Sequence, residues 1–138
     1  ENPLVLLDGA HNQSGATVLR ESLERDFSYK RLLMVIGISE GEERKDVINI
    51  LTPLADELFI TSANSSRAVS IEELTLLVQK TGKPFQIAKK SRDALKYAMN
   101  KARQNDMICV TGSLYLIGEI RPCFNNSVTL IKGKSNAE

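Results

Sequence analysis

The chain has 138 residues, of which 42% are hydrophobic and 25% are charged, and its formal net charge is +1. This length and composition fit one globular domain with a substantial buried core. The small net charge gives no electrostatic reason to bind nucleic acid, and no apolar run approaches the ~20 residues that span a bilayer. We therefore expect neither nucleic acid nor a membrane as a partner.

The cysteines and the first residues indicate where the protein works. Cys109 and Cys123 have neither the spacing of a metal site nor that of a disulfide framework. Cys109 lies in an apolar run, which favours a buried core thiol in a reducing cytoplasm. The chain starts at Glu1, almost inside an apolar run and without a signal-peptide pattern. We expect a cytoplasmic protein and a sequence that is a piece of a longer chain.

Short apolar runs alternate with segments of helical periodicity along the whole chain. The expected strands are 4–7, 32–36, 58–61, 85–87 and 107–111, and the expected helices are 12–26, 45–54, 70–80, 91–102 and 114–120. This alternation predicts an α/β fold in three layers, with a mostly parallel sheet of five to six strands and helices on both faces. We expect this domain to occupy residues 1–122, with an edge strand over 127–131 and a polar tail completing 123–138.

Several residues predict where helices begin and end. Pro53 is expected to end or bend the second helix. Ser70 and Glu73 have the spacing of a capping box at the start of the third helix. Ser91 is expected to cap the fourth helix.

All strands of a parallel sheet end at the same edge, and open α/β folds bind their ligands there. That edge should collect four segments rich in polar residues and glycine, namely 8–12, 37–39, 61–67 and 111–113. The sequence therefore predicts a candidate site at this edge.

The segment at the end of the first strand, Asp8-Gly9-Ala10-His11-Asn12, is rich in groups that bind ligands. Asp8 can accept two hydrogen bonds from the vicinal diol of a ribose, or it can cap a helix or satisfy a loop. Gly9 lets the backbone approach a ligand closely, or it supplies a turn. His11 lies near a helix N-terminus, where amides favour phosphate, although a lone loop histidine is often structural. Asn12 is equally suited to cap the helix or to contact a ligand.

Other candidate contacts lie in two more of these segments. Thr111-Gly112-Ser113 can present amides and hydroxyls to the same ligand, although a turn capped by Ser113 is the simpler explanation. Arg67 can meet a carboxylate or phosphate, or it is simply solvated. The acids of segment 40–46 are too dispersed to predict a metal site. The sequence has no phosphate loop, no dinucleotide fingerprint and no nucleophile with a nearby base, so the domain carries at most part of an active site.

Two motifs resemble those of one enzyme family. Residues 6–12, Leu-Leu-Asp-Gly-Ala-His-Asn, are similar to the aspartate-glycine-alanine-histidine-asparagine motif of folylpolyglutamate synthases and dihydrofolate synthases. Residues 111–121, Thr-Gly-Ser-Leu-Tyr-Leu-Ile-Gly-Glu-Ile-Arg, resemble that family's closing signature. Weaker features match at 45–46 and 66–68, and the resemblance spans about residues 3–121.

This family belongs to the Mur ligase superfamily, whose members join an amino acid to a carboxylate using ATP. The resemblance implies that the chain is the Rossmann-like C-terminal domain of a ligase that adds L-glutamate to dihydropteroate, tetrahydrofolate or both, through an acyl phosphate. The phosphate loop, the Mg²⁺ ligands and most of the folate site would lie on a missing N-terminal P-loop domain of the same chain. The domain alone should fold without being catalytically active.

The same resemblance implies roles for individual residues. Asp8 would hold the ribose hydroxyls of ATP within an ATP-binding loop that includes Gly9, and Asn12 would support that loop. His11 would lie near the phosphates and the acyl-phosphate chemistry, as the catalytic residue. Arg67, together with Ser113 and Tyr115 of the closing signature, would be a candidate contact to substrate or to neighbouring loops.

Three other functions share parts of this pattern. A different Mur-type ligase, such as a peptidoglycan precursor ligase, would have the same fold, but the histidine and the closing signature argue against it. A stand-alone nucleotide-binding module would lack an upstream phosphate loop. A purely structural flavodoxin-like domain would tolerate the loss of Asp8 and His11.

Overall fold

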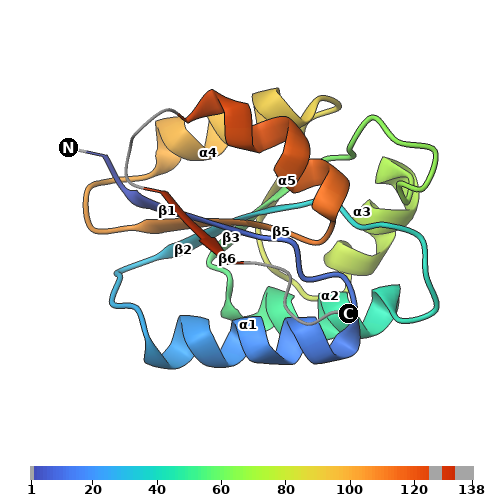
Figure 1. Cartoon of the computed structure of the whole chain (residues 1–138), viewed down its shortest axis with the longest axis horizontal. Coiled ribbons are helices and arrows are strands. Elements are labelled where there is room, and N and C mark those ends of the chain that lie inside the picture. Colours follow the sequence, from blue (N-terminus) through green and yellow to red (C-terminus); the bar gives the residue numbers. More distant parts are fainter. Residues whose placement is uncertain (1, 125–128, 133–138) are drawn as a thin grey trace.

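The computed structural model describes residues 2–124 and 129–132. Six strands form one sheet in the order β4-β3-β2-β5-β1-β6, and every neighbouring pair is parallel. The strands are β1 (Leu4–Asp8), β2 (Leu32–Ile36), β3 (Glu57–Ile60), β4 (Phe85–Ile87), β5 (Met107–Thr111) and β6 (Thr129–Lys132). The predicted three-layer α/β fold with a parallel sheet is confirmed (Figure 1).

Helices cover both faces of this sheet. They are α1 (Gln13–Arg25), α2 (Arg44–Leu51), α3 (Ile71–Gln79), α4 (Ser91–Lys101) and α5 (Leu114–Ile120), with short 3₁₀ helices η1 (Thr52–Leu54) and η2 (Arg121–Cys123). Helices α1, α2 and α3 pack on one face, and α4 and α5 pack on the other (Figure 1). The sheet is therefore the middle layer of the fold.

The alternation of side chains along each strand divides the core in two. In β1, Leu6 faces the cluster under α1–α3, whereas Val5 and Leu7 face the cluster under α4 and α5. All five residues of β2 and of β5 are buried because these strands lie inside the sheet and are covered on both faces. Burying one such aliphatic side chain stabilises the fold by about 1.5–3 kcal/mol, so the uninterrupted apolar runs of these strands are a consequence of the architecture.

Most helix boundaries follow the signals expected from the sequence. Helix α2 ends at Leu51, and Thr52–Leu54 tighten into a 3₁₀ turn, because Pro53 has no N–H to continue the α-helical pattern. Ser70 caps α3 by accepting the Glu73 N–H at 3.1 Å. The Glu73 carboxylate, however, accepts from Arg44 Nε, at the start of α2, at 2.7 Å. Glu73 therefore makes a tertiary contact in place of the capping-box bond expected from the sequence.

The prediction that Ser91 caps α4 is wrong. The N-cap is Lys90, which makes no side-chain capping bond, and Ser91 is the first helical residue. Its hydroxyl donates to a carboxylate oxygen of Glu119 in α5 at 2.6 Å. A distant acceptor has therefore replaced the local amide that a capping serine would bind.

The last described strand lies at the edge of the sheet. Strand β6 pairs with β1, at nearly the position expected from the sequence. Most of the polar tail predicted beyond it, residues 133–138, lies outside the described residues. Within the described part of the chain, every helix is too short or too polar to cross a membrane.

Candidate functional site

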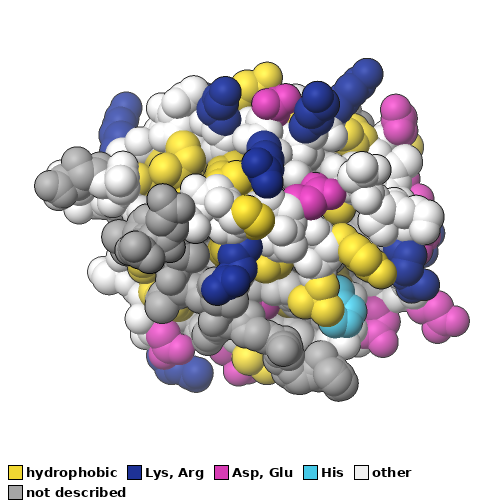
Figure 2. Space-filling view, turned by 45° about the horizontal axis from the view of Figure 1, so that its top comes forward, with side chains coloured by type: hydrophobic (Ala, Val, Ile, Leu, Met, Phe, Trp, Pro, Cys, Tyr) yellow, Lys and Arg dark blue, Asp and Glu magenta, His cyan; other side chains and the backbone are white. Residues whose placement is uncertain are grey.

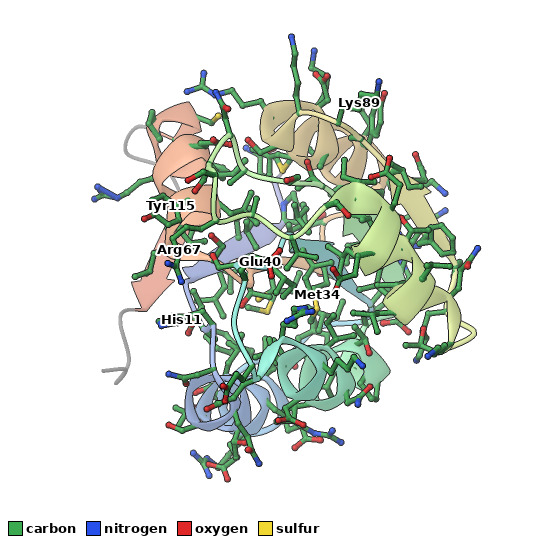
Figure 3. All side chains as sticks on the ribbon, turned by 90° about the vertical axis from the view of Figure 1, so that its right-hand side faces the viewer. His11, Met34, Glu40, Arg67, Lys89 and Tyr115 are labelled. Atoms are coloured by element: carbon green, nitrogen blue, oxygen red, sulfur yellow. The ribbon has the colours of Figure 1, made fainter. Side chains whose placement is uncertain are left out.

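The strand ends that were predicted to meet lie in one row. In the sheet register, Asp8 of β1 pairs with Thr111 of β5, which also pairs with Ile36 of β2, and Ile36 pairs with Ile60 of β3. The loops that follow these strands therefore share one edge. Figure 3 looks onto this edge, and His11, Glu40, Arg67 and Tyr115 are labelled there.

Asp8 is held at the end of β1 by its own loop. Its side chain is buried, with a residue exposure of 5%, and Oδ1 accepts the Ala10 N–H at 2.9 Å. Burial raises the pKa of the Cys109 thiol in the adjacent strand β5, and the negative charge of Asp8 adds to this effect. Cys109 is therefore a neutral, buried core thiol, as the sequence predicted.

His11 stands at the surface of the same loop. Its Nδ1 lies 3.0 Å from the carbonyl oxygen of Gly9. A carbonyl can only accept, so the proton of this bond is on Nδ1, and Nε2 is the ring atom that a neutral His11 offers to a ligand. Figure 2 shows this histidine, the only one in the chain, next to hydrophobic side chains. Leu114 and Tyr115, at the start of α5, are both exposed.

Gly9 of this loop lies against the start of α5. A Cβ on Gly9 would collide with the side chain of Leu114 in α5. The sequence left a close approach to a ligand and a simple turn open for Gly9, and in this structure the group that approaches it is the side chain of Leu114. That contact ties the loop after β1 to the start of α5.

The start of α1 is both capped and bound to an anionic oxygen. Asn12 is the N-cap, and its Oδ1 accepts the Gly15 N–H at 2.8 Å. The next amide, Gln13 N–H, donates to Glu43 Oε1 at 2.7 Å from the loop that precedes α2. A helix N-terminus favours negative charge, and here a carboxylate of the same chain already occupies one of its amides.

Ser113 connects two of the loops. Its Oγ accepts the backbone N–H groups of Tyr115 and Leu116 at 3.1 and 3.3 Å, so Ser113 is the N-cap of α5. The same oxygen lies 3.0 Å from Ser39 Oγ in the loop after β2. The two hydroxyls share one hydrogen bond, which joins the loops after β2 and β5.

Arg67 has a fixed backbone and an exposed side chain. Its carbonyl accepts the Glu40 N–H at 2.6 Å, next to an antiparallel bridge between Ser39 and Ala68. Its own N–H donates to Ser65 Oγ at 3.1 Å. Over residues 2–124, the Arg67 guanidinium makes no hydrogen bond or ion pair.

The structure brings the predicted residues to one edge by two routes. The adjacency of β1 and β5 places the Asp8–Asn12 loop beside Ser113 and Tyr115. The loop after β2 bonds to Ser113 and also to the backbone of Arg67, which lies in the loop after β3. Within the described residues, no three His, Cys, Asp or Glu side chains are grouped to hold a metal ion.

Sequence reasoning missed three residues that connect these loops. Ser39 bonds to Ser113, 74 residues away, and Glu43 bonds to Gln13, 30 residues away. Glu119 bonds to Asn64, 55 residues away. No local pattern signals pairs at such separations, because helix and strand periodicities report only on near neighbours.

Comparisons with known proteins bear on the domain as a whole. A family model described as "Dihydrofolate synthetase, C-terminal domain" matches residues 1–123. The dihydrofolate synthase/folylpolyglutamate synthase of Bacillus subtilis is 29% identical over 121 residues, which cover 88% of this chain and 28% of the relative. The dihydrofolate synthetase of Saccharomyces cerevisiae is 28% identical over 131 residues, with 88% and 31% covered.

A solved structure is also similar. The Mycobacterium tuberculosis folylpolyglutamate synthase complexed with ADP and AMPPCP superposes with a TM-score of 0.77 at 26% identity, over 86% of this chain and 29% of that one. The chain therefore spans less than a third of the length of these relatives.

Proposed function

The chain belongs to the family of dihydrofolate synthetase C-terminal domains, and from this we propose that it is the C-terminal domain of an ATP-dependent ligase that adds L-glutamate to a folate. The acceptor is dihydropteroate, tetrahydrofolate or both. The observation that carries the proposal is the Asp8–Asn12 loop at the row of strand ends, beside a helix N-terminus that binds a carboxylate oxygen.

In this proposal the Asp8–Asn12 loop binds ATP. Asp8 accepts hydrogen bonds from the ribose hydroxyls, and its bond from Ala10 orients the carboxylate for that task. Gly9 and Asn12 shape the loop, and the N-terminus of α1, which Asn12 caps, lies nearest the phosphates. Gln13 N–H shows that this helix end binds an anionic oxygen, and a phosphate that uses this amide would have to displace the Glu43 carboxylate.

The proposed reaction has two steps. The γ-phosphoryl group of ATP moves to a carboxylate oxygen of the folate, giving ADP and an acyl phosphate. The amino nitrogen of glutamate then attacks the carbonyl carbon, the bond to the phosphate oxygen breaks, and the nitrogen gives up its proton as phosphate leaves. Negative charge develops on oxygen in both steps, so oriented donors are the main catalytic resource. We place His11 Nε2 beside the phosphates, with Nδ1 anchored to Gly9.

The rest of the site would come from the preceding part of the parent chain. We assign the protein ligands of Mg²⁺, like the phosphate loop, to that upstream domain, as the family resemblance implies. Closure of the two domains would exclude water from the acyl phosphate. Arg67 and Tyr115, which are exposed, would face the substrates across this closure, whereas the buried Ser113 would hold the neighbouring loops in place.

The test is a ligation assay on the full-length protein with MgATP, L-glutamate and either dihydropteroate or tetrahydrofolate. We expect Asp8→Asn and His11→Ala each to lower kcat/KM for ATP about 10- to 100-fold, the range expected for losing a charge-assisted or well-oriented hydrogen bond. Glu21→Gln, on the exposed face of α1, is the matched control and should behave as wild type.

Each other outcome has a defined meaning. Failure to ligate glutamate to either acceptor would overturn the folate assignment. Turnover of another carboxylate would then favour a different Mur-type amide ligase, and nucleotide binding without any ligation would favour a non-catalytic module. Ligation that neither variant impairs would leave the ligase in place and remove the assignment of Asp8 and His11.

A further inference from the structure

Glu119 of α5 joins three separate elements through one carboxylate. Its Oε2 accepts the Asn64 N–H in the loop after β3 at 2.7 Å, and its Oε1 accepts the Ser91 hydroxyl at the start of α4 at 2.6 Å. Both oxygens are therefore used. Charge-assisted hydrogen bonds of this length are among the stronger ones in proteins.

The surroundings of Glu119 favour this arrangement. Ser91 is only 5% exposed, so its bond to Glu119 is shielded from water. Glu119 also lines a cavity of about 520 Å³ whose wall includes Lys89, Lys90 and Arg92.

The loop that Glu119 holds is fixed at its other end as well. Val69 N–H donates to the Ile38 carbonyl at 2.8 Å, and Glu40 N–H donates to the Arg67 carbonyl at 2.6 Å. The loop after β3 is thus held at Asn64 by α5 and at residues 67–69 by the loop after β2. Arg67 sits at the second attachment, with its guanidinium exposed.

We propose that Glu119 is a positioning residue, which holds the loop after β3 so that Arg67 can receive a carboxylate of the substrate. The inference rests on the proposed function, in which both L-glutamate and the folate carry carboxylates. A guanidinium binds a carboxylate through two parallel N–H···O bonds, and this geometry requires a defined backbone position. Fixing the loop in advance lowers the ordering that binding would otherwise require.

The first measurement examines the attachment itself. In this chain, Glu119→Ala removes both carboxylate oxygens, so the Asn64 N–H and the Ser91 hydroxyl lose their acceptor. We expect the Asn64 amide to exchange its hydrogen about 10-fold faster or more, as judged by NMR. Ser91→Ala is the matched control, because the Oε2–Asn64 bond remains and Asn64 exchange should stay as in wild type. Unchanged exchange in Glu119→Ala would overturn the positioning role.

The second measurement uses the full-length ligase. Glu119→Ala and Arg67→Ala should each raise KM for L-glutamate or for the folate by about 10-fold, while KM for ATP stays unchanged. The double variant should be no worse than Arg67→Ala alone, because Glu119 acts through Arg67. Additive effects would overturn the proposal, and so would an equal rise in KM for ATP. If the ligase accepts neither folate, the proposed function fails. The exchange rate of the Asn64 amide still tests whether Glu119 holds the loop after β3.

Discussion

Among single residues, Asp106 makes the most shielded ion pair described, at the sheet edge opposite the candidate site. Its side chain is 3% exposed and accepts from Arg31 Nε at 3.1 Å, from Arg31 NH2 at 2.7 Å and from Arg103 N–H at 2.9 Å. Burial alone would raise the pKa of Asp106, but the hydrogen bonds from Arg31 and Arg103 outweigh it and hold this pKa below its usual value. The carboxylate therefore ties the starts of β2 and β5 together.

Asp106→Asn should lower the free energy of unfolding by about 2 kcal/mol at neutral pH, because Arg31 and Arg103 lose a charged acceptor. A lowered carboxyl pKa stabilises the fold above the unfolded-state value, about pH 4, and this stabilisation is lost as pH falls through the folded-state pKa. The gap between wild type and variant should therefore be constant near neutrality and shrink below about pH 4.

Urea unfolding across this pH range measures the gap, with exposed Glu42→Gln as the matched control. A gap that persists unchanged into acid would contradict the role given to the Asp106 charge.

Among the elements, the crossing of the loops after β2 and β5 has the tightest backbone approach. Gly112 has φ of +112°, and a Cβ there would collide with the carbonyl oxygen of Gly37. Only glycine fits, because the conformation is left-handed and the obstacle is backbone. Gly118, in the exposed part of α5, has nothing within 4 Å of an added Cβ.

These two glycines make a matched pair. Gly112→Ala should destabilise the chain by at least about 2 kcal/mol, through strain and the collision with Gly37. Gly118→Ala should stabilise it by about 0.5–1 kcal/mol, because alanine is the better helix former. Chemical denaturation of the chain measures both changes. Similar effects at the two positions would show that the loop crossing is looser than the structure indicates.

At the scale of the whole molecule, the chain has a complete sheet with a core on each face but only one side of the proposed site. Both hydrophobic clusters are formed by residues of this chain alone. We therefore expect one cooperative unfolding transition.

The chain alone should ligate no glutamate and should bind ADP at least about 100-fold more weakly than the full-length protein, because most nucleotide contacts would lie upstream.

Calorimetric titration with ADP and a ligation assay on both proteins test this expectation. Equal ADP affinity in the two proteins would mean that this domain carries the whole nucleotide site. Ligation by the chain alone would likewise contradict the assignment of the phosphate loop to the upstream part.

The sequence by itself determined the elements and the local caps. The apolar runs predicted β2 and β5 most directly, because a strand buried on both faces leaves no polar position in its interior. Ser70 and Ser113 cap their helices as expected, because such a bond joins residues two or three apart and needs no tertiary partner. The Asp8–Asn12 loop was recognisable as a candidate site for the same reason, since its chemistry lies in adjacent residues.

Only the tertiary structure decided the long-range partners. Ser91 lies where the sequence predicts a helix cap, but its hydroxyl donates to Glu119, 28 residues away. Glu73 lies where a capping box is predicted, but its carboxylate pairs with Arg44, 29 residues away. A hydroxyl or carboxylate bonds to whichever partner stands nearest in space, and a charged or shielded partner outcompetes a local amide. Sheet order and helix packing determine which partners come near, and those depend on the whole chain.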